Sequence, residues 1–330
     1  MNFNTHTLKF SAIVTMITLT IVSIFLLSLP KKHAIMHKSI DESNNDITIL
    51  SANVGNLDLK CRKYLNNLCL TKVEAQTKKQ INFLSPDIVA FQEILSPGQC
   101  PDRDVNSQYA CSDTSGLPQI RRLLGSDYSI VCDNRNQFEC MGVHRRFGKF
   151  AICTEGGMCR TPRTDTPNPE CDNGFTVSVA TVETWSGEKF DLVNAHLQST
   201  SKSCRITMLK QLFIGNNAMP PLIQEDKVLI VGDFNFDPWR ATDESAAFWR
   251  NLLAAGWHGR SFKYHSGIAE NNPPRKTSHF LWWGKTVDIV LSNFLEGVCV
   301  TLGETPGTKR LDGGHGMDHR AIYCTLRLAP

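Results

Sequence analysis

The sequence predicts an α/β fold built from mixed β-sheets. Through the first half of the chain, short apolar segments rich in β-branched residues alternate with helical patterns. The second half is richer in closely spaced strand pairs of the hairpin kind, which implies antiparallel as well as parallel pairing. The 330-residue chain shows no internal repeat and no second composition regime beyond its N-terminal part, so a single domain over 46–330 is expected.

The expected elements begin with a strand over 46–52 and a helix over 71–84. Thr71 is the predicted cap of this helix, Glu74 completes a capping box, and Pro86 lies beyond its end. The turn at 185–188 joins two strands as a hairpin. Further strands are predicted at 87–93, 128–132, 150–153, 175–184, 189–196, 228–231, 286–292, 298–302 and 320–328, and further helices at 117–124, 202–216 and 244–255.

The first 30 residues are of a different kind. Residues 10–29 carry no charge and are mostly apolar, and about twenty such residues suffice to cross a bilayer. The run is longer than the core of a typical signal peptide, and no clear small-x-small cleavage site follows it. We therefore predict an N-terminal hydrophobic helix within 1–30 that anchors the chain in a membrane, with a cleaved signal peptide as the alternative. The polar stretch 31–45 is expected to be a linker.

The twelve cysteines indicate an exported domain. All of them follow the apolar segment, their number is even, and they form neither a Cys-x-x-Cys motif nor zinc-finger spacing with histidine. This usage is typical of a disulfide framework in an oxidising compartment. Close spacing suggests the pairs Cys61–Cys69, Cys100–Cys111 and Cys132–Cys140. The lysines at 31, 32 and 38 favour a cytoplasmic C-terminal side, but the cysteines outweigh them. We expect the domain to face the periplasm or the extracellular side, or to be secreted if the N-terminus is cleaved.

Polar side chains of one chemical kind lie at the ends of the apolar strands. In Gly232-Asp233-Phe234-Asn235, the aspartate and the asparagine are two residues apart and would face one spot on an extended chain. Carboxylates and amides are the ligands that Mg²⁺ prefers, and histidine is suited to acid–base work near neutral pH. The chain has no phosphate-binding Gly-x-x-x-x-Gly-Lys loop and no Gly-x-Ser-x-Gly elbow. The candidate residues are Asn53, Glu93, His196, Asp233, Asn235, Asp288, Asp318 and His319.

Six short segments carry these residues in one order along the chain. They are Ser-Ala-Asn-Val (51–54), Phe-Gln-Glu (91–93), Asn-Ala-His-Leu (194–197), Gly-Asp-Phe-Asn (232–235), Val-Asp-Ile-Val-Leu (287–291) and Met-Asp-His-Arg-Ala (317–321). Together they resemble the endonuclease/exonuclease/phosphatase family, the deoxyribonuclease-I-like superfamily of metal-dependent phosphoesterases. The resemblance implies a four-layer sandwich of two mixed β-sheets flanked by helices, with the active site at the edge where strand ends converge.

The resemblance also implies a metal site. Glu93 would bind the divalent metal directly, Asn53 would help to set the metal and the phosphate, and Asp318 would be a second carboxylate on the metal side. Mg²⁺ is the expected ion, with Mn²⁺ and Ca²⁺ as alternatives.

The remaining residues would act on the phosphate and the attacking water. Asp233 would orient or deprotonate the water, and Asn235 would hold a phosphoryl oxygen. His196 would contact the phosphate or the leaving-group side. His319, polarised by Asp288, would be a transition-state donor or a general base, so the choice between Asp233 and His319 as proton acceptor stays open.

The expected function is an exported Mg²⁺-dependent phosphodiesterase, with a nuclease ranked first. Arg145 and Arg146 are weaker candidates for contacting a phosphate, because a solvated basic turn explains them as well. The alternatives are a sphingomyelinase-type phospholipid phosphodiesterase or a phosphoinositide phosphatase on the same scaffold, which a membrane anchor would favour. A non-catalytic binding module is disfavoured because every expected polar position is occupied.

Overall fold

The computed structural model describes residues 46–56, 58–100, 106–166, 171–172, 174–216, 219–240, 242–266, 277–278 and 285–329. The predicted hydrophobic helix at 10–29 and the linker at 31–45 lie outside these residues. Within the described ranges, no helix is both long enough and apolar enough to cross a membrane.

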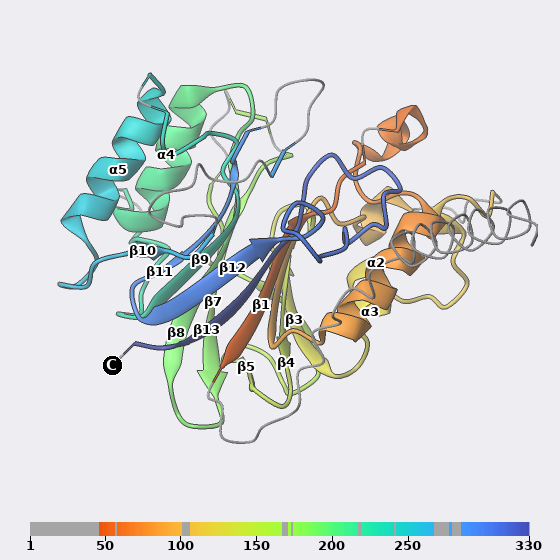
Figure 1. Ribbon diagram of the computed structural model, residues 1–330, viewed down its shortest axis with the longest axis horizontal. Helices are drawn as coiled ribbons and strands as arrows, with labels where there is room; N and C mark the ends of the chain where they lie inside the picture. Colours follow the sequence, from red (N-terminus) through yellow and green to blue (C-terminus); the bar gives the residue numbers. More distant parts are fainter. Residues whose placement is uncertain are drawn as a thin grey trace, which may run out of the picture. The chain divides into compact units, whose positions relative to one another are not determined.

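Two mixed β-sheets form the centre of the domain (Figure 1). The strand order is β12-β13-β1-β2-β4-β3-β6 in the seven-stranded sheet and β10-β11-β9-β8-β7-β5 in the six-stranded sheet. The pairs β1–β2, β3–β6 and β8–β9 are parallel and the others are antiparallel. The strands are β1 (Ile47–Asn53), β2 (Ile88–Gln92), β3 (Tyr128–Asp133), β4 (Cys140–His144), β5 (Gly148–Phe150), β6 (Met158–Thr161), β7 (Val177–Thr184), β8 (Lys189–His196), β9 (Val228–Asp233), β10 (Lys263–Tyr264), β11 (Asp288–Ser292), β12 (Leu295–Thr301) and β13 (Ile322–Leu328).

Helices cover the outer face of each sheet, as Figure 1 shows. Those on the seven-stranded sheet are α2 (Thr71–Leu84) and α3 (Gln119–Leu124), and those on the six-stranded sheet are α4 (Lys202–Phe213) and α5 (Glu244–Ala255). Loops of the described residues also contain the short 3-10 helices η1 (Leu59–Tyr64), η2 (Pro97–Gln99) and η3 (Ala110–Ser112). The predicted four-layer sandwich is therefore confirmed.

The central strands are buried on both faces, so apolar layers lie between the two sheets and under the helices of each sheet. A fourth, smaller cluster surrounds the Cys61–Cys69 disulfide. In β9, Leu229 and Val231 face the other sheet, whereas Val228 and Ile230 face α4 and α5. Side chains alternate across a strand, so a strand between two apolar layers needs an uninterrupted apolar run. This explains why the segment before Gly232 is continuously apolar.

Most predicted elements are present, and the exceptions have local reasons. The helices over 71–84 and 244–255 have the expected bounds. The prediction of Thr71 as a cap was wrong: Leu70 is the N-cap and makes no side-chain cap bond, and Glu74 instead pairs with Arg122. The sequence analysis missed β4, β6 and β10. Of these, β6 is a partly exposed edge strand in a Pro-rich stretch, and β10 has only two residues.

Six disulfides account for all twelve cysteines, and no cysteine is free. The three predicted pairs, Cys61–Cys69, Cys100–Cys111 and Cys132–Cys140, are confirmed. The other three are Cys153–Cys159, Cys171–Cys204 and Cys299–Cys324.

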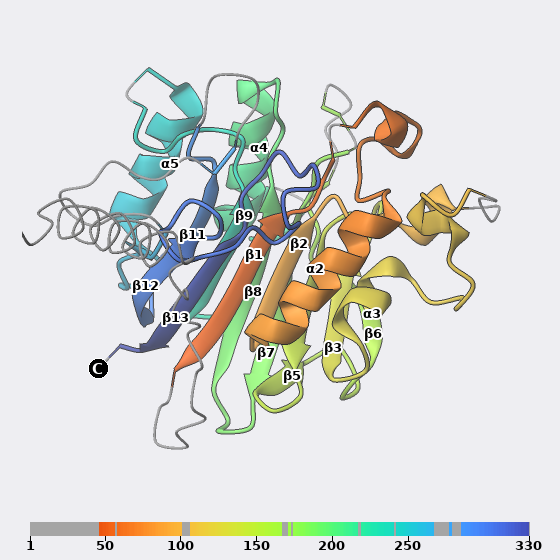
Figure 2. The same ribbon diagram turned by 45° about the vertical axis from the view of Figure 1, so that its right-hand side comes forward.

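Strand ends from both sheets meet at one edge of the sandwich. The parallel pair β1–β2 ends there in one sheet and the parallel pair β8–β9 ends there in the other. Just below this edge, the buried Gln92 side chain donates to the side-chain oxygen of Asn194 across the two sheets (2.6 Å). Figure 2 shows the loop before β13 reaching the end of β1, where Asn56 forms a bridge with Met317. This loop brings residues 318 and 319 to the same edge.

Candidate active site

One row across the six-stranded sheet carries three of the predicted residues. His196 is in register with Asp233 on the parallel strand β9, and Asp233 is in register with Asp288 on the antiparallel strand β11. Gly232 makes this close spacing possible, because a Cβ there would lie 2.0 Å from the carbonyl oxygen of Ala195 on β8. The glycine of the Gly-Asp-Phe-Asn segment is thus a packing requirement of the row.

Asn53 joins the two sheets at the site. Its side-chain Nδ2 donates to Glu93 Oε1 (2.9 Å) and to Asp233 Oδ2 (3.2 Å), and its Oδ1 accepts the backbone N–H of Gly55 (3.0 Å). Both carboxylates are therefore held by the amide nitrogen of one buried side chain. In this geometry Asn53 positions the carboxylates, and its oxygen faces the backbone of the following loop.

Glu93 is turned into the site by an unusual backbone. Its φ is 60°, in the left-handed region that a residue with a Cβ adopts only at a cost. Its carboxylate lies against the backbone of Gly55, where a Cβ would be 1.7 Å from Oε2. Burial raises the pKa of Glu93, opposed by His196 and by the bond from Asn53, while the nearby Asp318 raises it further.

His319 and Asp288 form a buried pair that points at Asp233. Nδ1 of His319 is 2.9 Å from Asp288 Oδ2, and its Nε2 is 3.6 Å from Asp233 Oδ2. Burial alone would lower the pKa of His319, but Asp288 and then Asp233 outweigh it and hold that pKa well above its usual value. His319 donates through Nδ1 to Asp288, so only its other ring nitrogen, Nε2, faces the reaction space.

His196 has a similar buried partner that the sequence analysis did not find. Its Nδ1 is 3.0 Å from Oε1 of the fully buried Glu139, so its Nε2 faces Glu93 (3.6 Å) and Asp233 (3.9 Å). Burial, and next the charge of Asp133, hold the pKa of Glu139 well above its usual value. Glu139 lies at the end of the β3–β4 connection, outside any strand-end motif, and an isolated glutamate beside Cys140 carried no signal.

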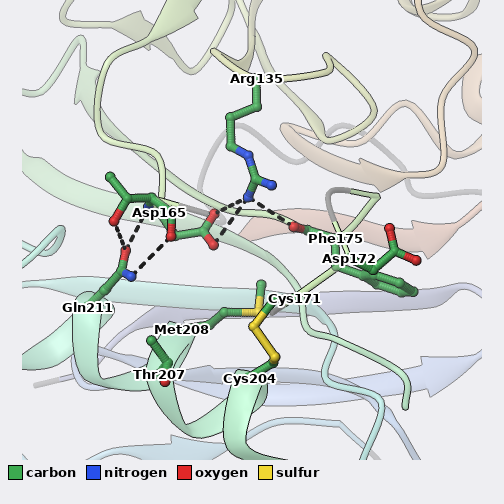
Figure 3. A pocket seen from close by; sticks show the side chains of 10 residues that line it. Arg135, Asp165, Cys171, Asp172, Phe175, Cys204, Thr207, Met208 and Gln211 are labelled. Carbon is green, nitrogen blue, oxygen red and sulfur yellow. Dashed lines mark hydrogen bonds and ion pairs between the residues drawn. A yellow bond between two sulfur atoms is a disulfide. The ribbon is translucent and has the colours of Figure 1, made fainter. Parts of the chain in front are cut away.

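A layer behind His196 supports its ring. The ring of Phe175 packs edge-on against it, with centroids 4.7 Å apart. Arg135 holds this support in place, since its Nη1 donates to the carbonyl oxygen of Phe175 (3.1 Å) and to both carboxylate oxygens of Asp165 (3.2 and 3.3 Å). Figure 3 shows these contacts at a small pocket beside α4. Burial raises the pKa of Asp165 to about 6 despite the opposing effect of Arg135.

Asn235 lies at the site, but not on an extended strand as expected. The strand ends at Asp233, and Asn235 lies in the turn beyond it with a φ of 51°. Its backbone N–H donates to Asp233 Oδ1 (2.8 Å), and its Nδ2 donates to the carbonyl oxygen of Leu197 (2.8 Å) and to Asp233 Oδ2 (3.3 Å). The two side chains face one spot because the chain folds back, and not because an extended strand continues.

Arg145 and Arg146 are not brought to this cluster. They follow β4, which runs antiparallel to β2, so they lie at the opposite end of the sheet from Glu93. Arg145 pairs with Asp127 (2.9 Å), and Arg146 pairs with Asp87 (2.7 Å). Both arginines are therefore occupied at the far edge of the sandwich.

The donor set fits a hard divalent cation. Glu93 and Asp318 keep 24% and 20% of their side-chain surface exposed. Burial raises the pKa of both carboxyls, Asp318 raises that of Glu93 further, and Asp233 raises that of Asp318 further. Carboxylates gathered in this way are stabilised by a cation, and oxygen ligands are those that Mg²⁺, Mn²⁺ and Ca²⁺ take. Atoms of Asp233, Asp288 and His319 also lie within 4.8 Å of one another, but the pairing of Asp288 with His319 suits proton transfer better than ligation.

No protein-family model and no curated protein matches the chain. Solved structures do match its fold. A humanized D. rerio TDP2 is 17% identical with a TM-score of 0.56, and D. rerio TDP2 complexed with a single strand DNA product is 15% identical with a TM-score of 0.54; each comparison covers 86% of this chain and 100% of the other.

Two further solved structures also match the fold of this chain. The human Nocturnin catalytic domain with a bound sulfate anion is 15% identical (TM-score 0.54; 87% of this chain and 96% of that one). An endonuclease/exonuclease/phosphatase from Bacteroides vulgatus is 14% identical (TM-score 0.53; 87% and 100%). The chain thus has the fold of the endonuclease/exonuclease/phosphatase superfamily, which confirms the resemblance seen in the sequence.

Proposed function

We propose that the protein is a divalent-metal-dependent phosphoric ester hydrolase. The observation that carries this proposal is the buried Asp288–His319 pair, whose free ring nitrogen faces Asp233 across 3.6 Å beside the Glu93–Asn53 contact. A carboxylate, an oriented imidazole and a cation-binding carboxylate around one space are the groups that hydrolysis of a phosphoester requires.

Each side chain has a role that its contacts support. Asp233 accepts the proton of the attacking water, because two amide donors hold its Oδ2 in place. His319, steadied by Asp288, donates to a phosphoryl oxygen through Nε2. His196 donates to the phosphate or leaving-group oxygen through Nε2, because its Nδ1 is engaged by Glu139.

Glu93 and Asp318 would hold the cation, and Asn53 would keep Glu93 oriented. When bound, a divalent cation there neutralises charge that develops on the phosphoryl oxygens. Burial is the main reason why the pKa values of Glu93 and Asp318 are raised, and a further carboxylate adds to each, Asp318 for Glu93 and Asp233 for Asp318. Mg²⁺ is the ion we propose, with Mn²⁺ and Ca²⁺ as substitutes.

A nucleic acid is the substrate class that we place first. The D. rerio TDP2 structure with a single strand DNA product has the same fold, which supports a phosphodiester of this kind. Six disulfides support the proposal that the domain works in an oxidising, exported location. Attachment through residues 10–29 remains part of that proposal.

A substrate panel tests the proposed function. The purified full chain is incubated with single-stranded DNA, duplex DNA, RNA, sphingomyelin and inositol phosphates, with Mg²⁺ or with a chelator. Metal-dependent cleavage of a nucleic acid, lost in Asp233→Ala and in His319→Ala, is the expected result. Cleavage of a lipid alone would replace the nuclease by a phospholipid phosphodiesterase, and full activity in either variant would refute the site.

A further inference from the structure

The loop that leaves the active-site edge after β1 carries a rigid projection, η1. Figure 1 shows it in orange at the upper right, standing out from the body of the domain. The disulfide Cys61–Cys69 closes this segment, and the buried Asn67 ties it down by donating to the carbonyl oxygen of Ile94 and to Gln99 Oε1 (3.0 Å each). The shape of the projection is therefore fixed before it meets a partner.

The outer surface of this projection is apolar and basic at once. We define the η1 face by four of the exposed side chains of this segment, those of Leu59, Lys60, Arg62 and Leu65. Leu59 is 75% exposed and Leu65 is 64% exposed. Neither Lys60 nor Arg62 forms an ion pair with another described residue. The nearest acidic residue in the sequence, Asp58, uses its side chain to accept the backbone N–H of Lys60.

Leu65 has a backbone conformation that is unfavourable for a leucine. Leu65 has φ 58° and ψ 28° at the end of η1, and its N–H bonds to the carbonyl oxygens of Arg62 and Cys61. Glycine and asparagine take this left-handed position at less cost, and either would also remove an apolar side chain from water. A leucine at this point is unfavourable twice over in the isolated domain, which points to an apolar environment that the side chain meets elsewhere.

We propose that the η1 face docks on an anionic lipid surface. Leu59 and Leu65 would enter the boundary between headgroups and acyl chains, and Lys60 and Arg62 would contact the lipid phosphates. Aliphatic side chains beside cations are typical of interfacial lipid binding. Single-stranded nucleic acid is instead bound by exposed aromatic rings, and the aromatic ring of this segment, Tyr64, is 6% exposed.

The position of the face gives docking a consequence for the active site. Asn56, at the base of the projection, bridges to Met317, which directly precedes Asp318. Docking would hold this edge of the sandwich close to the lipid surface. The inference goes beyond the proposed function, because it concerns where the domain works and does not depend on which phosphoester it cleaves.

The test uses the full chain with a tryptophan introduced at η1, because residues 10–29 are themselves predicted to bind lipid. Its signal is taken as the difference from the parent protein, which has six tryptophans of its own. Leu59→Trp is mixed with vesicles of brominated phosphatidylcholine, with or without phosphatidylserine, and its fluorescence is compared with that of the parent protein. The matched control is Ile214→Trp, since Ile214 is 59% exposed after α4 on the other sheet. We expect the brominated chains of the phosphatidylserine vesicles to quench the tryptophan at 59 and not the one at 214.

Charge reversal tests the cations. Adding Lys60→Glu and Arg62→Glu to Leu59→Trp should lower the ratio of docked to undocked η1, read from the extent of quenching at saturating lipid, by about fivefold for each cation. The same reversals at Lys202 and Lys210, which are exposed on α4, should leave it unchanged. Adding Asp233→Ala should also leave it unchanged, so lipid docking and hydrolysis can fail separately.

Two results would overturn the proposal. One is equal quenching of the two introduced tryptophans, which would mean that η1 has no special contact with lipid. The other is unchanged lipid quenching in the charge-reversed variant together with weaker binding of single-stranded DNA, which would make η1 a nucleic-acid surface.

Discussion

Replacing Asp288 by asparagine should separate the charge of this side chain from its shape. The substitution keeps an oxygen that accepts from Nδ1 of His319 but removes the carboxylate that lies 2.9 Å from it. The backbone N–H of Asp288 also bonds to Thr277 Oγ1 (3.0 Å), and this contact is kept. The fold should therefore survive while the orientation and charge of the imidazole change.

The size of the effect follows from the burial of the pair. Asp288 and His319 have side chains that are 1% and 8% exposed, so water does not replace the lost contact. A hydrogen bond to a charged group contributes about 1.5–3 kcal/mol, and about 1.4 kcal/mol corresponds to a factor of ten. We expect kcat/KM to fall about ten- to hundredfold.

The pH profile identifies the role of the imidazole. Although burial acts to lower the pKa of His319, Asp288 raises it, so Asp288→Asn should lower it. If His319 donates as the imidazolium, activity is lost as pH rises through its pKa, and the alkaline limb should move to lower pH. If His319 is instead the general base, the acidic limb should move.

A matched variant and a double mutant complete the assay. Asp226→Asn removes the carboxylate of another Asp–His pair, Asp226–His258, which is exposed and lies just before β9, at the opposite end of that strand from Asp233, and should leave kcat/KM unchanged. Because Asp288 acts through His319, combining Asp288→Asn with His319→Asn should cost no more than His319→Asn alone. Additive losses in the double variant, or wild-type activity in Asp288→Asn, would refute the reasoning.

Three further predictions concern the backbone, the metal and a buried carboxyl. Gly232→Ala should lower the free energy of unfolding by about 3 kcal/mol or more in a denaturant titration, because its Cβ would lie 2.0 Å from the carbonyl oxygen of Ala195. Gly187→Ala, at a positive φ with open space, should cost only about 1 kcal/mol. Saturating Mg²⁺ should raise the Tm of the wild type by about 5 °C and leave that of Glu93→Gln unchanged; equal shifts would exclude Glu93 as a ligand. The pKa of Asp165 is about 6 in the fold, above its unfolded value, so the stability that its protonated form contributes is complete below about pH 4. This contribution is lost as pH rises through about 6, and Asp165→Asn should abolish that part of the decline in urea titrations.

The residue types of the site were predictable from short segments. Continuous apolar runs predicted strands buried on both faces, and the polar residues that follow them mark where such strands end. The local disulfides were predictable for a similar reason: Cys61–Cys69 and Cys132–Cys140 each span only 8 residues, so the chain itself keeps the partners close.

The far ends of the same strands were harder to assign. The sequence did not show at which edge of the sheet Arg145 and Arg146 lie. Their true position depends on β4, which the sequence did not reveal and which runs away from the site beside β2. Only the pairing and direction of the strands show at which end of the sandwich a loop lies.

The sequence alone determined which chemical groups stand at the strand ends, because burial of the strands leaves a strong local pattern. The tertiary structure decided how these groups pair. Asn53 reaches Asp233 across 180 residues, and His196 reaches Glu139 across 57. Such contacts depend on which strands are neighbours and which sheets stack, so no local pattern encodes them. They decide which nitrogen of each histidine faces the reaction space, and therefore what each histidine can do.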